Sequence, residues 1–108
     1  MYKEAANKLK QNTEIMETVF RKYNLKISGF NVKPDDEGGV NYLIELTGGQ
    51  LKDAVQVKVN LYDADNTICA MESMVIGEDF SGYDTISIYF SDGILDEAVK
   101  ARVFPAPF

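Results

Sequence analysis

Apolar and polar residues alternate along the middle of the chain. Between positions 54 and 62 every second residue is apolar, and these residues are Val55, Val57, Val59 and Leu61. A period of two is typical of a β-strand with one buried face, and the Asp63–Asn66 segment after it is rich in turn-forming residues. Because a second apolar segment follows, the pattern predicts a central hairpin of two strands, 54–62 and 67–76.

The start of the chain has a helical period instead. Apolar residues recur at spacings of three and four, in a stripe made of Ala5, Leu9, Met16, Val19, Phe20 and Tyr23. This spacing places them on one face of a helix, so residues 2–23 are predicted to form one amphipathic helix. Asn12 and Thr13 weaken the middle of the stripe, and a break at that point is the alternative.

Four more segments have strand-like alternation and are separated by turns that contain Gly, Pro, Asn or Asp. They cover residues 25–32, 40–46, 83–90 and 98–104. Gly29 indicates a bulge or a close backbone approach in the first of them, Pro34 ends that strand, and Pro105 and Pro107 end the last one. Residues 94–97 fit either a helical turn or an extension of the last strand.

Strands that follow one another without intervening helices favour an antiparallel sheet system. A chain of 108 residues has the size of one domain, and two sheets packed face to face can bury many one-faced strands. We therefore predict a mainly β fold, an antiparallel immunoglobulin-like sandwich of about six to seven strands over residues 25–108. One N-terminal amphipathic helix, residues 1–24, precedes it in the same compact unit. A single curved sheet with the helix packed across it is the alternative.

The end of the central strand, Val59–Asp63, resembles the motif of the FxLYD-type domains. In these small immunoglobulin-like sandwiches a strand ends in Phe-x-Leu-Tyr-Asp, and here Val59 stands in place of the Phe. The segment 99–104 also resembles their closing strand, so the likeness covers about residues 25–105. The resemblance implies an immunoglobulin-like sandwich that serves as an accessory or binding module, often on bacterial envelope proteins. It implies no catalytic residues.

Acidic residues outnumber basic ones by 17 to 11, which gives a formal charge of −6. That field repels nucleic-acid phosphates, and the basic residues of the first quarter alternate with glutamates, so no nucleic-acid partner is expected. No apolar run approaches the ~20 residues of a membrane-spanning helix, and no apolar signal-peptide core follows Met1. We expect the cytoplasm for the chain as given, or an extracytoplasmic location if it is a piece of an envelope protein.

No motif for catalysis or for a cofactor is present. The chain contains no His, which excludes Ser–His and Cys–His catalysis as well as a Cys/His zinc site. The single cysteine, Cys69, lies in an apolar segment and is predicted to be a small buried hydrophobe. We therefore expect a protein that is not an enzyme and that carries no cofactor.

Oxygen-bearing side chains alternate in the turn Asp63-x-Asp65-x-Thr67, as they do in calcium-binding loops. An EF-hand would need Gly and an acidic residue where Ile68 and Met74 stand. A plain turn, in which Asp and Asn side chains bind nearby backbone groups, explains these residues without a metal. No metal ligand is assigned, and a weak calcium- or ligand-binding sandwich is kept as an alternative.

Two surfaces are candidates for protein contacts. The apolar stripe of the helix must be buried, either on its own sandwich or against a second copy or another chain. Tyrosines on the strand faces opposite the core could add contact area, or they could instead cover a second face or the rim of the sandwich. The candidate residues are Leu9, Met16, Val19, Phe20, Tyr62 and Tyr89. The sequence thus favours a non-catalytic interaction module, with a homo-oligomer assembled through the helix as the alternative.

Overall fold

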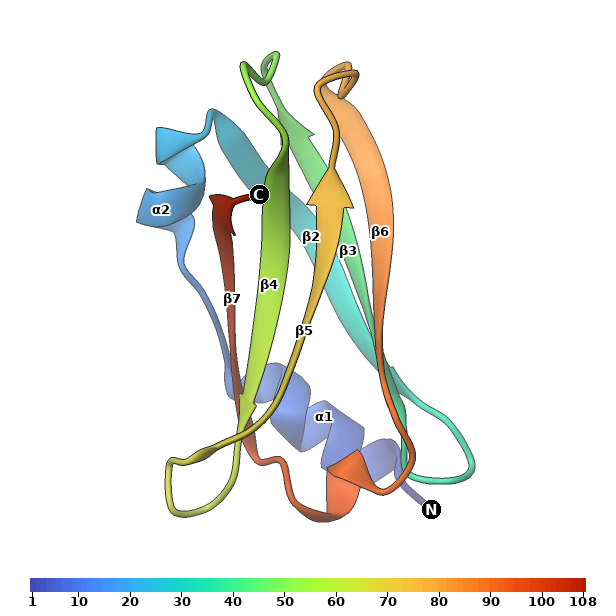
Figure 1. Ribbon diagram of the computed structural model, residues 1–108. Helices are drawn as coiled ribbons and strands as arrows, with labels where there is room; N and C mark the ends of the chain where they lie inside the picture. Colours follow the sequence, from blue (N-terminus) through green and yellow to red (C-terminus); the bar gives the residue numbers. More distant parts are fainter.

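Strands with one apolar face build two sheets that pack against each other, in a computed structural model that describes residues 1–108 (Figure 1). Sheet A has the strand order β1-β7-β4-β5, and sheet B has the order β2-β3-β6. The predicted mainly β sandwich is confirmed, with seven strands. Its elements are α1 (Lys3–Gln11), β1 (Thr13–Ile15), α2 (Glu17–Lys22), β2 (Leu25–Pro34), β3 (Val40–Gly48), β4 (Val55–Tyr62), β5 (Ile68–Ile76), β6 (Tyr83–Phe90), a short 3-10 helix (Ile94–Asp96) and β7 (Lys100–Pro107).

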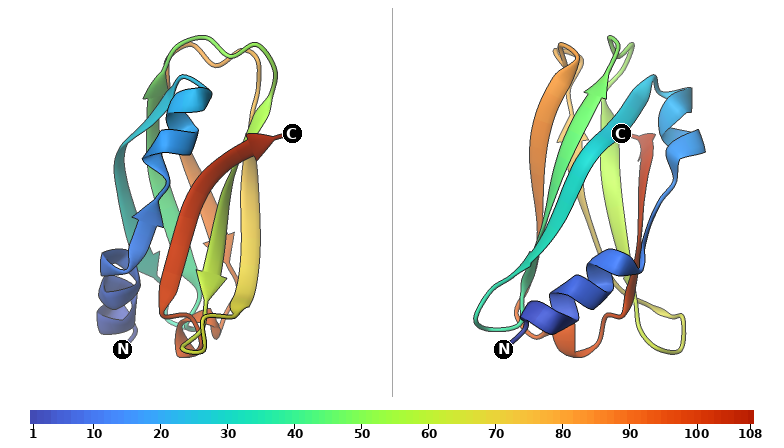
Figure 2. Two further views of the ribbon diagram at one scale, coloured as in Figure 1. Left: turned by 90° about the vertical axis from the view of Figure 1, so that its left-hand side faces the viewer. Right: turned by 180° about the vertical axis from the view of Figure 1, so that it is seen from behind.

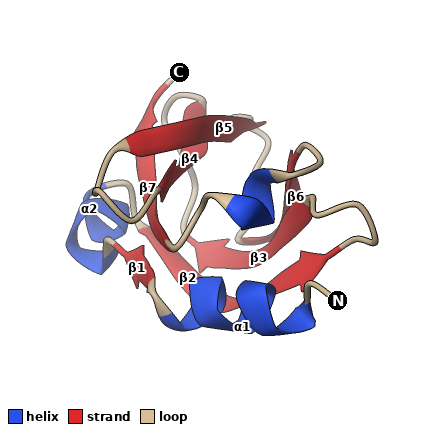
Figure 3. Ribbon diagram, turned by 90° about the horizontal axis from the view of Figure 1, so that it is seen from below, coloured by secondary structure: helices blue, strands red, loops and turns tan.

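Two hairpins lie in different sheets and are tied together by the later strands. The pair β2–β3 belongs to sheet B and the pair β4–β5 to sheet A, as the sequence predicted for 54–62 and 67–76. Strand β6 then returns to β3, and β7 returns to β4, so the chain crosses between the layers four times, at β1–β2, β3–β4, β5–β6 and β6–β7. All pairs are antiparallel except β1 with β7, which is parallel. Figure 3 shows the two layers end-on.

The core lies between the sheets and follows the alternation in the sequence. Every second residue of β3 and of β4 is buried, and the intervening residues face outward. Tyr42 is fully buried and meets Phe90 edge to face, with ring centroids 6.1 Å apart. Burial raises the pKa of Tyr42 to about 12, and its hydroxyl pairs with Thr13 Oγ1 at 3.0 Å. This bond ties β1 to the opposite sheet.

The N-terminal segment is helical, but the prediction of one unbroken helix over 2–23 is wrong. Two short helices, α1 and α2, flank the three-residue strand β1. The break falls at Asn12 and Thr13, where the apolar stripe weakens. Thr13 Oγ1 donates to the Leu9 carbonyl at 2.8 Å, and Ala101 N–H donates to the Asn12 carbonyl at 3.2 Å. The open edge of β7 therefore captures residues 13–15 as a strand.

The helices pack on their own sandwich, which decides between the two predicted ways of burying the stripe. Ala6 and Leu9 of α1 and Phe20 of α2 are buried in the common core. Both helices contact β2, and α1 crosses one end of the sandwich beside that strand (Figures 2 and 3). They thereby cover the outer edge of sheet B.

The remaining strand predictions differ from the structure mainly at the C-terminal end. The bulge in β2 is confirmed, since the register shifts between Ile27 and Gly29. Residues 94–96 form a helical turn. Pro105 and Pro107 do not end the last strand, because β7 continues to residue 107. The backbone N–H and C=O groups of the odd residues of β7 point toward β1. Because β1 ends at Ile15, it has no carbonyl opposite the two prolines, so their missing N–H groups leave no acceptor unpaired.

Candidate interaction surface

The outer face of sheet A is a ladder of cations and apolar side chains. Alternation places the even residues of β7 and β4 on this face, because their odd neighbours, such as Val59 and Val103, are buried. Cross-strand pairing aligns them in rows with the outward residues of β5. From β7 through β4 to β5, three of these rows are Arg102–Asn60–Met71, Phe104–Lys58–Ser73 and Ala106–Gln56–Val75.

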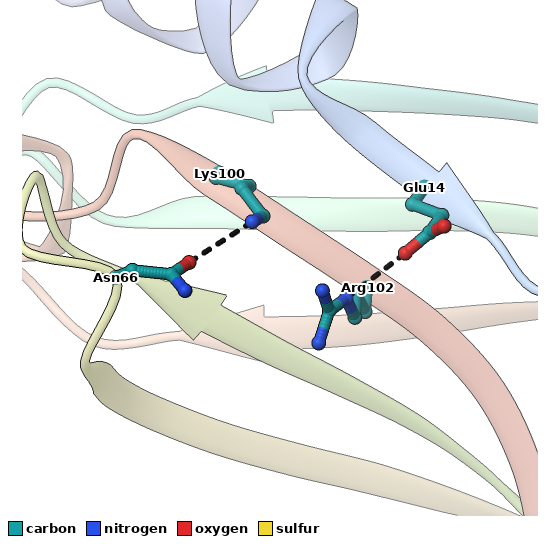
Figure 4. Close-up of polar contacts among 4 residues, drawn as sticks. All are labelled: Glu14, Asn66, Lys100 and Arg102. Carbon is teal, nitrogen blue, oxygen red and sulfur yellow. Dashed lines mark hydrogen bonds and ion pairs between the residues drawn. The ribbon is translucent and has the colours of Figure 1, made fainter.

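Tyr62 anchors one end of this ladder. Lys100 Nζ lies 5.4 Å from the centroid of its ring and Arg102 Cζ lies 5.2 Å from it, within the range of cation–π attraction. Lys100 Nζ donates to Asn66 Oδ1 at 2.9 Å, and Arg102 Nε donates to Glu14 Oε1 at 2.9 Å (Figure 4). Tyr62 and, after it, Glu14 raise the pKa of Arg102. The structure therefore uses Tyr62 as a platform for its own cations.

This arrangement corrects the idea of Tyr62 as an exposed contact residue. The residue lies outside the apolar core cluster, as expected, but only 7% of its surface is exposed. The cations that cover it belong to the same chain. A partner that approaches this face would meet Lys100 and Arg102 before it met the ring.

Sheet A concentrates positive charge on a chain whose formal charge is −6. Its outer face carries Lys58, Lys100 and Arg102, and Glu14 is the only acid among the paired residues of that face. Lys100 and Arg102 are engaged within the chain. Lys58 takes part in no ion pair, side-chain hydrogen bond or cation–π contact, so its ammonium group is free for a partner.

Strand β5 adds exposed apolar surface next to these cations. It is the edge of sheet A, paired with β4 on one side only. Met71 is 61% exposed on the outer face. Met74 pairs with the core residue Val57 and is exposed too, so β5 is open on both faces. The exposed large apolar residues of this strand are Ile68, Met71, Met74 and Val75.

The other edge strands have features that discourage a further strand from pairing with them. Strand β1 is three residues long, and β2 has a bulge, ends in Pro34 and packs beneath both helices. Strand β6 presents Asp84, Thr85 and Ser87 among its exposed residues. The one charged residue of β5, Glu72, pairs with Val59 and so lies on the face toward sheet B. Strand β5 shares two such features, the inward-facing charge of Glu72 and a bulge at Cys69, but its regularly paired part from Ala70 to Ile76 has no proline and no charge on its outer face.

The opposite face of the molecule holds Tyr89, the other candidate tyrosine. It is exposed as predicted, and its hydroxyl lies 2.7 Å from Asp35 Oδ2 and 2.9 Å from Asp92 Oδ1. The hydrogen bond from Tyr89 is the main reason that the pKa of Asp35 is lowered, and Asp92 is the main reason that the pKa of Glu37 is raised. Because Tyr89 lies on sheet B, it does not share a surface with Tyr62.

The helix candidates are likewise scattered. Leu9 and Phe20 are buried, Val19 is half-buried, and only Met16 is exposed. The six predicted contact residues thus do not form one site. The residues that do share a surface, Lys58, Met71 and Val75, were not among them. Their signal in the sequence is that apolar residues of 67–76 fall on both strand parities instead of alternating.

The remaining features of chemical interest have structural explanations. Asp63 Oδ1 accepts hydrogen bonds from the N–H groups of Asp65 and Thr67 at 2.9 and 3.0 Å, so the plain-turn interpretation is confirmed. Cys69 is half-buried, and burial raises the pKa of its thiol. A shallow depression of about 490 Å³ lies on sheet B around Gly29, where Glu45 is held by Ser28 and Tyr83.

No group of three or more acidic or cysteine side chains is arranged to hold a metal ion. None of the helices has the length and apolar character needed to cross a membrane. Comparisons with protein-family models, with curated proteins and with solved structures give no match to this chain.

Proposed function

We propose that this chain is a non-catalytic binding module that contacts a protein partner through strand β5 and the outer face of sheet A. The observation that carries this proposal is the exposure of β5 on both faces, with four large apolar side chains in contact with water. Such a strand is costly to leave open, because unpaired edges with apolar side chains promote association. A partner that covers it would bury apolar surface and satisfy the open backbone groups.

The resemblance of Val59–Asp63 to FxLYD-type domains supports the same proposal, since it implies an accessory or binding module. An assembly through the N-terminal helices is less favoured. Two of the four apolar residues proposed for that contact, Leu9 and Phe20, are already buried in the chain's own core. The exposed apolar side chains of β5, in contrast, are not buried in the chain's own core.

Panning of a random peptide library against the immobilised protein tests the proposal. The variant Met71→Glu/Val75→Glu places charge on the outer face of β5, and Tyr83→Ser/Tyr89→Ser is the matched double change on the exposed face of sheet B. Peptides selected on the wild type should lose binding to the first variant and keep binding to the second. Failure to enrich any peptide, or loss of binding only with the sheet B variant, would contradict the proposal.

A further inference from the structure

We propose that β5 takes up an extended segment of the partner as an added strand, and that this segment has the order apolar-x-acidic-x-apolar. The inference rests on the proposed function and specifies the chemistry of the partner. Strand addition follows from the open edge of sheet A, whose last strand is paired on one side only. Backbone hydrogen bonds then supply affinity, and alternate side chains supply specificity.

The register of sheet A fixes which side chains the added strand would meet. Outward residues of β5 are Met71, Ser73 and Val75, paired with Asn60, Lys58 and Gln56 of β4. An added strand lies about 4.8 Å beyond β5, and its outward residues continue these rows. Three alternate guest residues would therefore stand beside Met71, Ser73 and Val75.

Lys58 selects the acidic residue at the middle position. It lies directly across from Ser73, the smallest outward residue in this part of β5. The long flexible stem of lysine can extend over a serine toward the next strand, whereas a large residue at that position would block it. Because Lys58 has no partner in the chain, its ammonium group can pair with a guest carboxylate.

Met71 and Val75 select the apolar residues on either side. Both are exposed on the outer face of β5, two positions before and after Ser73. Methionine is flexible and adapts to different apolar neighbours, which suits a surface that receives a side chain from another protein. Cross-strand apolar pairs in these two rows would bury the patch that is now in water.

Charge argues against the other occupants of this edge. In an antiparallel pair of β5 strands centred on Ser73, the free ammonium groups of both Lys58 residues would converge without a carboxylate between them. An anionic membrane or a nucleic acid would attract Lys58 but repel a chain of formal charge −6. A short segment with one carboxylate meets the same local cation and carries only one negative charge, so the chain repels it much less.

The test uses the capped peptide Thr-Val-Thr-Glu-Thr-Val-Thr, whose palindromic order makes strand direction irrelevant, and the same peptide with Lys in place of Glu. Amide shifts of the full chain are followed by NMR during titration. The wild type should bind the Glu peptide more tightly, and Lys58→Glu should invert that preference, each by about fivefold, as expected for an exposed ion pair. Lys26→Glu, a charge reversal on β2, should leave the preference unchanged.

Several outcomes would overturn the inference. Equal affinity for both peptides in the wild type would remove the acidic requirement and leave the proposed function standing, provided that panned peptides still bind β5. A concentration-dependent dimer in light scattering, abolished by Met71→Glu, would make a second copy the occupant. Sedimentation with vesicles of anionic phospholipid, lost in Lys58→Glu, would assign the surface to lipid.

Discussion

Tyr62 and its two neighbours each perform a separate local task at the end of β4. Leu61 is fully buried in the core, while Tyr62 lies on the outer face beneath two cations. Asp63 then closes the turn by accepting two backbone N–H groups. The Leu-Tyr-Asp order therefore joins a core strand to a tight turn, and the tyrosine also holds the positive charge of sheet A in place.

Among buried side-chain nitrogen and oxygen atoms, only Oδ1 of Asn60, two residues before Tyr62, accepts no hydrogen bond. An unsatisfied buried acceptor costs about 1–3 kcal/mol, and valine is better suited to a strand than asparagine. We expect Asn60→Val to raise the free energy of unfolding in urea by about 1 kcal/mol.

The matched change Asn41→Val on β3 should have the opposite sign. Asn41 Oδ1 accepts a hydrogen bond from Ser87 Oγ at 2.7 Å, and the valine would remove it. If both variants lost stability to the same extent, Asn60 would have to be satisfied in solution.

At the scale of elements, the local sequence pattern predicts most of the strands. It fails where contacts with residues far away in the sequence determine the secondary structure. The alternation of 54–62 and 83–90 is strong because each of these strands buries one face, and both form as predicted. Residues 67–76 also form the predicted strand, although their apolar residues fall on both parities. Thr13–Ile15 continues a helical stripe in the sequence. It becomes a strand because β7, almost ninety residues later, offers an open edge. The sequence around residues 13–15 does not indicate that pairing.

The same reason explains what could be predicted of the candidate surface. The exposure of Tyr89 follows from alternation in β6 and was predicted. Lys58 is an ordinary polar residue of a one-faced strand in the sequence, and its interest comes from its register with Ser73. The sequence predicts the turn Asp63–Asn66, but register also depends on the bulge at Cys69 just after it, and no local pattern indicates that bulge.

Helix α1 provides a prediction at this scale. Leu9 is fully buried between α1 and the sandwich. Truncation of such a residue removes apolar contacts and leaves a cavity, so Leu9→Ala should lower the free energy of unfolding by about 2–5 kcal/mol. The mass measured by light scattering should stay that of the wild type, since the helix packs within its own chain.

Met16→Ala is the control, because Met16 is exposed and its loss should change stability by less than about 0.5 kcal/mol. A drop in mass with either variant would show that the helices hold an oligomer together, contrary to the packing described above.

Over the whole molecule, charge is divided between the two sheets. Sheet A carries the free Lys58 and the engaged Arg102 on its outer face, whereas Asp35, Glu37 and Asp92 gather around Tyr89 at one end of sheet B. An acidic partner segment is therefore attracted to one face and repelled by the other. This asymmetry gives an encounter a preferred orientation even though the net charge is negative.

The acidic cluster also makes stability depend on pH. The pKa of Glu37 is raised above its ordinary value of 4.5, mainly because it shares a hydrogen bond with Asp92. The folded chain therefore binds this proton more tightly than the unfolded chain, so the contribution of Glu37 to stability rises as pH falls from neutrality toward 4.5. Asp35 acts in the opposite sense. Its lowered pKa makes its contribution decline only as pH falls below its ordinary value of 3.8.

Asp92→Asn separates these effects, because it removes the charge that faces Glu37 and leaves Asp35 in place. Without that repulsion the variant should melt at a higher temperature than the wild type at neutral pH. The difference should shrink as pH falls to 4.5, where the wild type protonates Glu37 and relieves the repulsion by itself. Scanning calorimetry at both pH values measures it, with Asp65→Asn in the exposed turn as the control that removes one carboxylate far from Glu37. A constant difference for Asp92→Asn would mean that Glu37 and Asp92 do not share a proton.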